Sequence, residues 1–201
     1  MQPGSDRDDE RQNILDAAYR CLLDPHSGPV SMSAILGSAG LSSRAFYRHF
    51  VSKDDLFLAL LDRAGGAVVA HVNAVAEAAV GSPPEQLAAW IGEMFDSLVD
   101  PDQLRQLTVV DCDEVRAAKG YRELRERFHV ERERSLTEIL RRGRADGSFP
   151  LTDPESDAVA VNAVVSRVMA HQNAEDVQSV KQAQARVLDF ALRAVGAVAP
   201  A

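Results

Sequence analysis

Four polar side chains lie close together in one short stretch of the chain: a hydroxyl at Ser43, guanidinium groups at Arg44 and Arg48, and a phenol at Tyr47. A guanidinium can donate two hydrogen bonds to the edge of a guanine, while hydroxyl and phenol groups can donate to phosphate oxygens. Isolated basic residues on a helix are more often simply solvated. Because hydroxyl, guanidinium and phenol groups occur together here, the stretch indicates contact with nucleic acid.

The charge distribution leaves this stretch without carboxylates. The 201 residues include 22 Lys and Arg and 30 Asp and Glu, which gives a formal net charge of −8 at pH 7. No acidic residue occurs between Asp24 and Asp54, whereas Arg44, Arg48 and Lys53 lie inside that window. DNA binding requires a local cationic face and not a positive protein as a whole. The acidic total therefore does not exclude a nucleic-acid partner.

The remaining reactive side chains form no recognisable catalytic or metal-binding motif. Cys21 and Cys112 have no neighbouring His or paired Cys, and the five histidines are scattered without metal-ligand spacing. The sequence has no glycine-rich phosphate loop and no nucleophile elbow. The carboxylates of Asp111, Asp113 and Glu114 are typical of a solvated face. We expect no enzyme activity, no cofactor and no metal, and two buried thiols in a reducing compartment.

Composition and hydrophobic periodicity predict an all-α protein of about nine helices. The chain is 46% hydrophobic but only 5% aromatic, which supplies a core and favours helices over a sheet. No apolar run is long enough to cross a bilayer, and the acidic start of the chain is unlike a signal peptide. We therefore expect a cytoplasmic protein that does not bind membranes.

Turn and capping residues indicate two short helices after a first helix at about residues 8–23. Ser31 is expected to cap a helix that ends near Ser38, and Ser42 to cap a further helix that reaches Phe50. Between them the chain must reverse at Gly40, and glycine tolerates the positive φ that such a turn often requires. A helix, a tight turn and a second helix form the unit that places its second helix in the major groove of DNA.

A long helix is expected from the capping box at Ser52–Asp55 to about Val80. Gly65 and Gly66 lie in its middle and are expected to bend it, because glycine pairs weaken the helical backbone. The remaining expected helices span about residues 85–98, 100–119, 121–144, 153–173 and 177–198.

The segment 14–60 closely resembles the DNA-binding region of the TetR family of repressors. The residues that carry the match are Ala39-Gly40-Leu41-Ser42, Phe46-Tyr47-Arg48-His49-Phe50, Ser52-Lys53 and Leu56. The resemblance implies backbone contacts to DNA from Ser31, Ser33, Tyr47, His49 and Lys53, and base contacts from Ser43, Arg44 and Ala45. Ser42 and Arg48 complete the candidate DNA-binding set. Many members carry a small residue and then threonine where this chain has Arg44-Ala45, so base preference does not carry over.

Beyond about residue 80 the resemblance is one of layout, and it implies a homodimer, a palindromic operator and a small-molecule effector. Family members dimerise through their last two long helices, for which the candidate residues here are Val161, Val164, Val168, Val187, Leu188, Ala191 and Val195. Pocket candidates are Trp90, Met94, Phe95, Phe128, Val165 and Met169, with His71 and Asn162 as polar anchors. The same apolar stripes are also typical of ordinary core.

The implied function is that of a transcriptional repressor that binds DNA as a dimer and is released when an effector moves the long helix. The expected domains are a disordered tail (1–7), a helix-turn-helix domain (8–52), a connecting helix (53–80) and a helical ligand-binding and dimerisation domain (81–201). Two alternatives remain open: a DNA-binding regulator whose C-terminal domain binds a protein partner, and a small helical enzyme.

Overall fold

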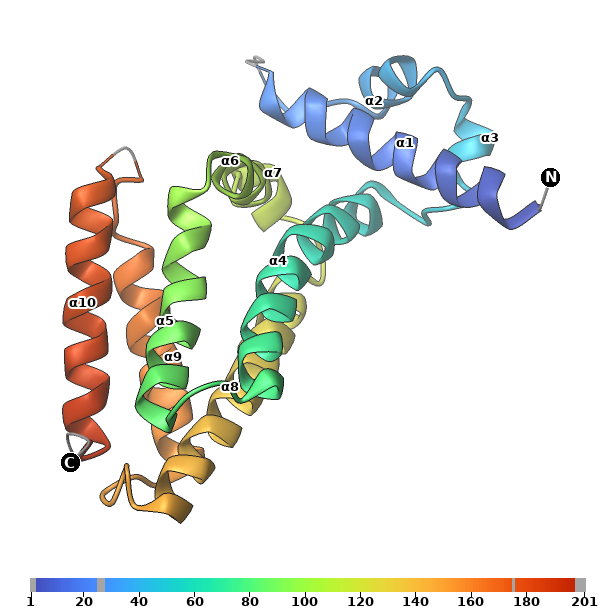
Figure 1. Cartoon of the computed structure of the whole chain (residues 1–201). Coiled ribbons are helices and arrows are strands. Elements are labelled where there is room, and N and C mark those ends of the chain that lie inside the picture. The colour runs from blue at the N-terminus through green and yellow to red at the C-terminus, as the bar shows by residue number, and fades with distance from the viewer. Residues whose placement is uncertain (1–2, 25–27, 175, 198–201) are drawn as a thin grey trace. The chain divides into compact units, whose positions relative to one another are not determined.

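The computed structural model describes residues 3–24, 28–174 and 176–197, which form ten α-helices and no β-strand (Figure 1). The all-α prediction is confirmed. The helix count exceeds the expected nine because the segment expected as one helix over residues 100–119 is divided near Asp111. The helices are α1 (Pro3–Leu23), α2 (Met32–Ala39), α3 (Ser43–Phe46), α4 (Lys53–Ala78), α5 (Pro83–Val99), α6 (Pro101–Val110), α7 (Asp113–Arg116), α8 (Tyr121–Asp146), α9 (Pro154–Met169) and α10 (Val177–Ala194).

The chain divides into two compact units. The N-terminal unit comprises residues 1–64 together with Arg105–Leu124, and the C-terminal unit comprises Gly65–Leu104 together with residues 125–201. Helices α4, α6 and α8 each contribute to both units. Residues 105–124, which the sequence boundaries assign to the C-terminal domain, instead cluster with the helix-turn-helix.

Serine caps begin the two short helices of the helix-turn-helix. Ser31 Oγ accepts a hydrogen bond from the Ala34 amide at 3.1 Å, and Ser42 Oγ accepts one from the Ala45 amide at 3.2 Å. Each bond satisfies an amide that the first turn of a helix leaves without a partner. Gly40 follows α2 with a φ of +67°, a conformation that glycine adopts without steric cost. Both expected caps and the expected turn are confirmed.

Helix α1 begins earlier than the sequence predicts. It starts at Pro3, so residues 3–7, expected in a disordered tail, belong to the helix, while residues 1–2 lie outside the described part of the chain. A proline is compatible with the first helical turn because an amide there needs no intrahelical partner. Asp6 in this turn also suits the positive end of the helix dipole.

Helix α3 is shorter than predicted and ends at Phe46 instead of Phe50. The Arg48 amide donates to the Ala45 carbonyl at 3.2 Å, and the His49 amide donates to the Phe46 carbonyl at 2.9 Å. Bonds to the residue three positions back tighten the backbone into a 3₁₀-type turn. The chain therefore leaves the helix before reaching the cap of α4.

Helix α4 runs without interruption through Gly65 and Gly66, and the expected bend there stays a prediction. A Cβ at Gly65 would lie 2.3 Å from Cε2 of Phe128 in α8, whereas a Cβ at Gly66 would meet nothing within 4 Å. The Phe128 ring is buried and occupies the space that a side chain at Gly65 would need. Close packing between α4 and α8 thus explains why residue 65 is glycine.

The C-terminal unit has an apolar core, around which α5, α9 and α10 stand side by side (Figure 1). Trp90 of α5 is fully buried, and its indole N–H donates to Ser135 Oγ of α8 at 2.9 Å. Arg142 of α8 donates to the Ala76 carbonyl of α4 at 2.9 Å and to Gln86 of α5 at 2.8 and 3.0 Å. These bonds fix three helices of the unit against one another.

Glu114 of α7 ties the segment Arg105–Leu124 to the helix-turn-helix. Its carboxylate oxygens lie 2.9 and 3.1 Å from the Val30 amide nitrogen, and Oε2 lies 3.1 Å from Lys53 Nζ. Lys53 also donates to the Val30 carbonyl. The expectation of a solvated face is therefore wrong for Glu114, which is partly buried, although Asp111 and Asp113 are exposed.

The two adjacent glycines of α4 give opposite expectations for alanine substitution. We expect Gly65→Ala to lower the free energy of unfolding by about 1–3 kcal/mol, because the new methyl group displaces the Phe128 ring. Gly66→Ala should raise it by about 0.5–1 kcal/mol, because alanine favours the helix and nothing crowds its methyl group. Urea denaturation of both variants beside the wild type measures the difference. Equal effects would contradict the packing account.

Removal of the Glu114 carboxylate should loosen the helix-turn-helix. We expect Glu114→Ala to lower the free energy of unfolding by about 1–3 kcal/mol, because the Val30 amide loses its acceptor and the partly buried Lys53 ammonium loses one of its two. Asp113→Ala, an exposed neighbour, should change it by about 0.5 kcal/mol or less. Denaturation gives both values, and hydrogen exchange should be faster at the Val30 amide in Glu114→Ala alone. An unchanged Val30 exchange rate would refute the proposed tie.

Candidate functional site

The exposed side of α3 presents the polar group that the sequence singled out. Ser43, Arg44 and Tyr47 are exposed, and none of these side chains hydrogen-bonds to another residue of the described chain. Tyr47 is 68% exposed, and its ring packs edge-on against Phe46 with centroids 5.3 Å apart. Phe46 and Phe50 are buried and stacked on each other. Hydroxyl, guanidinium and phenol groups are therefore available together on one surface.

Two predicted contact residues are turned inward. Ala45, implied to face a base, is only 5% exposed, because its position on α3 points toward the helix-turn-helix core. The His49 side chain, implied to contact the DNA backbone, is 2% exposed, and its Nε2 lies 3.2 Å from Oε2 of Glu10 in α1. In this conformation neither side chain is presented to a ligand.

Arg48 is paired within the chain. Its Nη2 lies 2.5 and 2.9 Å from the two carboxylate oxygens of Glu10, and the Arg7 guanidinium donates to the Arg48 carbonyl at 3.1 Å. The hydrogen bond from Arg48, followed by the contact with His49, lowers the pKa of Glu10 below its usual value. Glu10 therefore stays ionised near neutral pH and offsets the charge of Arg48. The sequence gives no sign of this pair, because 38 residues separate its members.

The remaining candidates differ in how accessible they are. Ser31, Ser33 and Ser42 are exposed, and the Oγ atoms of Ser31 and Ser33 lie 2.9 Å apart. The Lys53 side chain is 30% exposed, and besides its contacts with Val30 and Glu114 its ammonium lies 5.0 Å from the centroid of the Phe57 ring. Neither α2 nor α3 has an acidic residue in its first turn. The accessible surface of the helix-turn-helix is consequently polar and cationic.

The residues predicted to line a ligand pocket lie mostly in the core of the C-terminal unit. Trp90, Met94, Phe95, Phe128, Asn162 and Val165 are buried, and Met169 is partly buried. His71 is exposed on α4, so it does not serve as an anchor inside the core. Burial is compatible with either core packing or contact with a ligand, and the pocket assignment stays a prediction.

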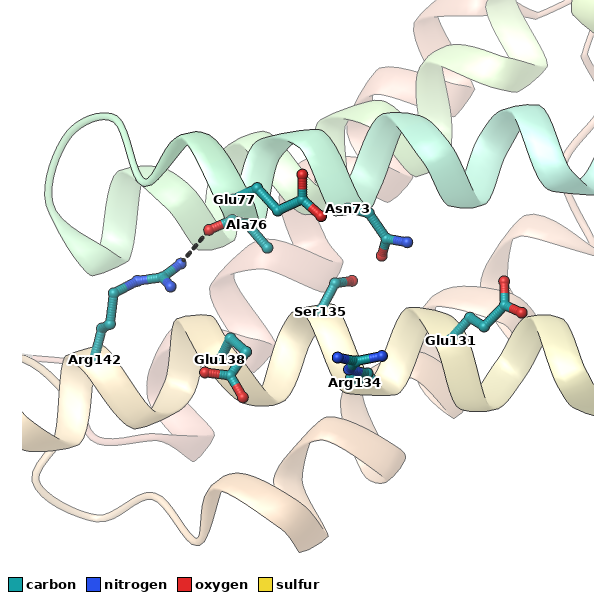
Figure 2. Close-up of a pocket in the computed structure, with 8 residues that line it drawn as sticks. All are labelled: Asn73, Ala76, Glu77, Glu131, Arg134, Ser135, Glu138 and Arg142. Atoms are coloured by element: carbon teal, nitrogen blue, oxygen red, sulfur yellow. Dashed lines mark hydrogen bonds between the residues drawn. The ribbon is translucent and has the colours of Figure 1, made fainter.

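A polar groove of about 450 Å³ lies between α4 and α8 within the C-terminal unit (Figure 2). Asn73 and Glu77 of α4 face Ser135 and Glu138 of α8 across it, and Arg142 reaches from α8 to the Ala76 carbonyl. None of the predicted pocket residues lines this groove. It connects to them indirectly, since Ser135 accepts the hydrogen bond from Trp90.

Most of the predicted dimer residues are turned into the chain's own core. Val161, Val187, Ala191 and Val195 are buried, whereas Val164, Val168 and Leu188 are partly buried against that core. The large apolar side chains that α9 and α10 do expose are Val159, Val177 and Phe190. Helical spacing finds the apolar stripe of a helix but cannot separate its inner face from an outer one.

The other chemical expectations concern thiols, metals and membranes. Cys21 and Cys112 are free and partly buried, so the expectation of fully buried thiols is wrong. Within the described ranges no group of three or more His, Cys, Asp or Glu side chains could hold a metal ion. None of the described helices is long and apolar enough to cross a membrane.

Two family models match the chain. Residues 14–60 match the model of bacterial regulatory proteins of the tetR family, and residues 83–188, more than half of the chain, match the C-terminal domain of tetracyclin repressor-like proteins. An uncharacterised HTH-type transcriptional regulator of Bacillus subtilis, YwcC, is 46% identical over 52 residues. That match spans 26% of this chain and only 23% of the relative.

Solved structures share the fold along nearly the whole chain. The complex of SmeT, a repressor from Stenotrophomonas maltophilia, with triclosan has a TM-score of 0.73 at 22% identity, covering 92% of this chain and 90% of that one. The regulator FadR from Bacillus subtilis in complex with stearoyl-CoA has a TM-score of 0.71 at 18% identity, covering 91% and 98%. Together with the two family models, these likenesses show that the chain belongs to the TetR family of helix-turn-helix transcriptional regulators, which are not enzymes.

Proposed function

We propose that the protein is a cytoplasmic transcriptional repressor that binds a palindromic DNA operator as a homodimer and releases it when a small molecule binds. The observation that carries the DNA contact is the exposed group of Ser43, Arg44 and Tyr47. The other cationic side chains of this surface, Arg48 and Lys53, already have partners within the chain. The exposed group is therefore the part of the helix-turn-helix that is free to form intermolecular hydrogen bonds.

Each exposed side chain has a role that follows from its chemistry. Arg44 is the candidate for base reading, because a guanidinium can donate two bonds to the O6 and N7 atoms of guanine. Ser43 and Tyr47 are candidates for phosphate contacts, which set the register of the protein on the duplex. Ser31 and Ser33 lie at the N-terminus of α2, where the helix dipole and free amides favour a phosphate.

The proposed dimer uses the outer faces of α9 and α10. Phe190 and Val159 are 43% and 51% exposed there, and a second copy would remove both from water. The buried residues Val161, Val187, Ala191 and Val195 would support these helices from within. Two copies would read half-sites about 34 Å apart, one turn of DNA, which is why we expect a palindromic operator.

The proposed effector binds the C-terminal unit. Related structures hold triclosan or stearoyl-CoA, which supports a small molecule as the effector class for this chain without naming it. Binding would act through a shift in population, because a ligand that prefers one arrangement of the dimer moves the equilibrium away from the arrangement that fits the operator.

The DNA-binding proposal predicts a specific loss of binding when α3 loses its exposed groups. Selection of bound fragments from a random DNA pool should yield a palindrome for the wild type. Arg44→Ala should weaken binding to that palindrome by about 10- to 100-fold and relax base preference at one position in each half-site. Tyr47→Phe should weaken it by about 2- to 10-fold without changing preference. Arg122→Ala, an exposed basic residue of α8, is the matched control.

Selection of DNA fragments by the wild-type protein at low salt is the decisive experiment, because contacts to phosphate are strongest at low salt. Failure to enrich any sequence under these conditions would overturn the proposal.

The dimer proposal predicts that a charge on the outer faces of α9 and α10 separates the two copies. We expect Phe190→Glu and Val159→Glu to sediment as monomers, because an unpaired carboxylate is costly to bury in an apolar interface. Val130→Glu, which changes an exposed valine of α8, should leave the wild-type sedimentation coefficient unchanged. Circular dichroism checks that each variant is folded. Dimers in both test variants would place the interface elsewhere.

A further inference from the structure

Three buried polar atoms on α8 and α9 have no hydrogen-bond partner among the described residues. They are Arg132 Nε, Asn162 Oδ1 and Ser166 Oγ. Asn162 is only 1% exposed, so water does not readily donate a hydrogen bond to its side-chain oxygen Oδ1. Native proteins leave few such atoms unpaired, because a buried polar group without a partner costs free energy. Three of them on two neighbouring helices therefore call for a partner that complements them.

Hydrogen bonds connect His129 with Arg132 and Asn162, and Asn162 with Glu133. We define these four residues together with Ser166, one turn further along α9, as the polar cluster. Arg132 Nη2 lies 2.8 Å from His129 Nδ1, and Asn162 Nδ2 lies 3.2 Å from the same nitrogen. The guanidinium and the amide thus converge on one atom. Ser166 follows Asn162 by one helical turn and lies on the same face of α9.

The hydrogen bonds inside the polar cluster determine which atoms remain to be paired. Glu133 Oε1 accepts from Asn162 Nδ2 at 2.9 Å, which fixes the orientation of the amide and leaves Oδ1 as an acceptor without a donor. His129 Nδ1 faces two donors and therefore acts as an acceptor. Burial, and then the nearby charges of Arg132 and Arg125, lower the pKa of His129, which favours the neutral ring that this arrangement requires.

Arg132 contributes a partly buried positive charge without a direct counter-ion. Within the described chain no carboxylate lies at ion-pair distance from its guanidinium, and its one hydrogen-bond partner is the neutral ring of His129. Burial and the charge of Arg125 lower the pKa of Arg132 to about 10, with Glu133 opposing this change. The group is still protonated at neutral pH. Its complement is an anion with an oxygen acceptor, since a guanidinium offers only donors.

We propose that the polar cluster recognises an organic acid that carries a hydroxyl or N–H group next to its carboxylate. Arg132 Nε and the Ser166 hydroxyl donate to the carboxylate, and Asn162 Oδ1 accepts from the adjacent donor. This inference rests on the proposed effector function and specifies the chemical class of the effector. The polar cluster shares no residue with the groove between α4 and α8.

Calorimetry on the full-length protein without DNA tests the site directly. The probes are mandelate, salicylate and 2-hydroxyoctanoate, each beside the acid that lacks the hydroxyl (phenylacetate, benzoate, octanoate) and beside its neutral amide. We expect at least one hydroxy acid to bind. Its amide should bind at least tenfold more weakly, because a charge-assisted bond to Arg132 is lost, and the acid without the hydroxyl about fivefold more weakly.

Two variants and one control assign these differences to the polar cluster. Arg132→Met should remove the preference for acid over amide, and Asn162→Leu should remove the preference for the hydroxyl. Arg134→Met changes an exposed arginine that lines the groove of Figure 2, and it should leave both preferences intact. Loss of binding in Arg134→Met alone would overturn the proposal in favour of the groove.

Thermal unfolding without ligand separates recognition from a structural role. We expect Arg132→Met to keep the wild-type Tm or raise it by about 2–4 °C, because a partly buried charge without a counter-ion is replaced by an apolar chain of similar length. A structural role for Arg132 would lower the Tm and overturn the proposal, as would the absence of binding by every hydroxy acid in the panel.

Release of the selected operator is measured separately. An acid that binds the cluster but leaves DNA bound would refute the proposed effector function while confirming the site.

Discussion

The carboxylate of Glu114 sets the position of the helix-turn-helix, because it receives hydrogen bonds from both ends of that motif. One comes from the Val30 amide just before α2, and another comes from Lys53 where α4 begins. The Val30 amide has its acceptor in Glu114, and the partly buried Lys53 ammonium donates both to Glu114 and to the Val30 carbonyl. The exposed face of α3 therefore depends on a residue of α7. For this reason residues 105–124 belong to the N-terminal unit although they lie far along the chain.

Features decided within one helical turn could be predicted from the sequence, and features decided by distant partners could not. Ser31, Ser42 and Gly40 act on amides or dihedral angles of their immediate neighbours, so their types and spacing were sufficient. Gly65 shows the opposite case: nothing in its local sequence indicates the Phe128 ring that fills the space where a side chain would lie. Likewise, nothing in the local sequence distinguishes Glu114, which is bonded, from Asp113, which is exposed.

The candidate sites follow the same division. The polar group of α3 was predictable because its residues are adjacent and their exposed face follows from helical period. The inward position of Ala45, and the pairing of Glu10 in α1 with Arg48 in the turn after α3, depend on contacts between residues that are distant in the sequence. In α9 and α10 apolar residues recur at the same helical spacing whether they pack against the chain's own core or against a second copy of the chain. Only burial separates Val161 from Val159, and only the hydrogen-bond pattern singles out Arg132, which the sequence analysis missed.

The absence of acidic residues from the first turns of α2 and α3 has a kinetic consequence for a chain with a net charge of −8. Most orientations in which such a protein approaches a polyanion are repelled. At physiological ionic strength this repulsion decays within about 8 Å. It therefore lowers the rate of wrongly oriented encounters and does not weaken the final complex. Encounters with DNA through the helix-turn-helix can proceed to a complex, whereas encounters through other faces are repelled. Non-specific adsorption through the rest of the surface is therefore suppressed. Added salt should weaken this orientational selection together with the attraction.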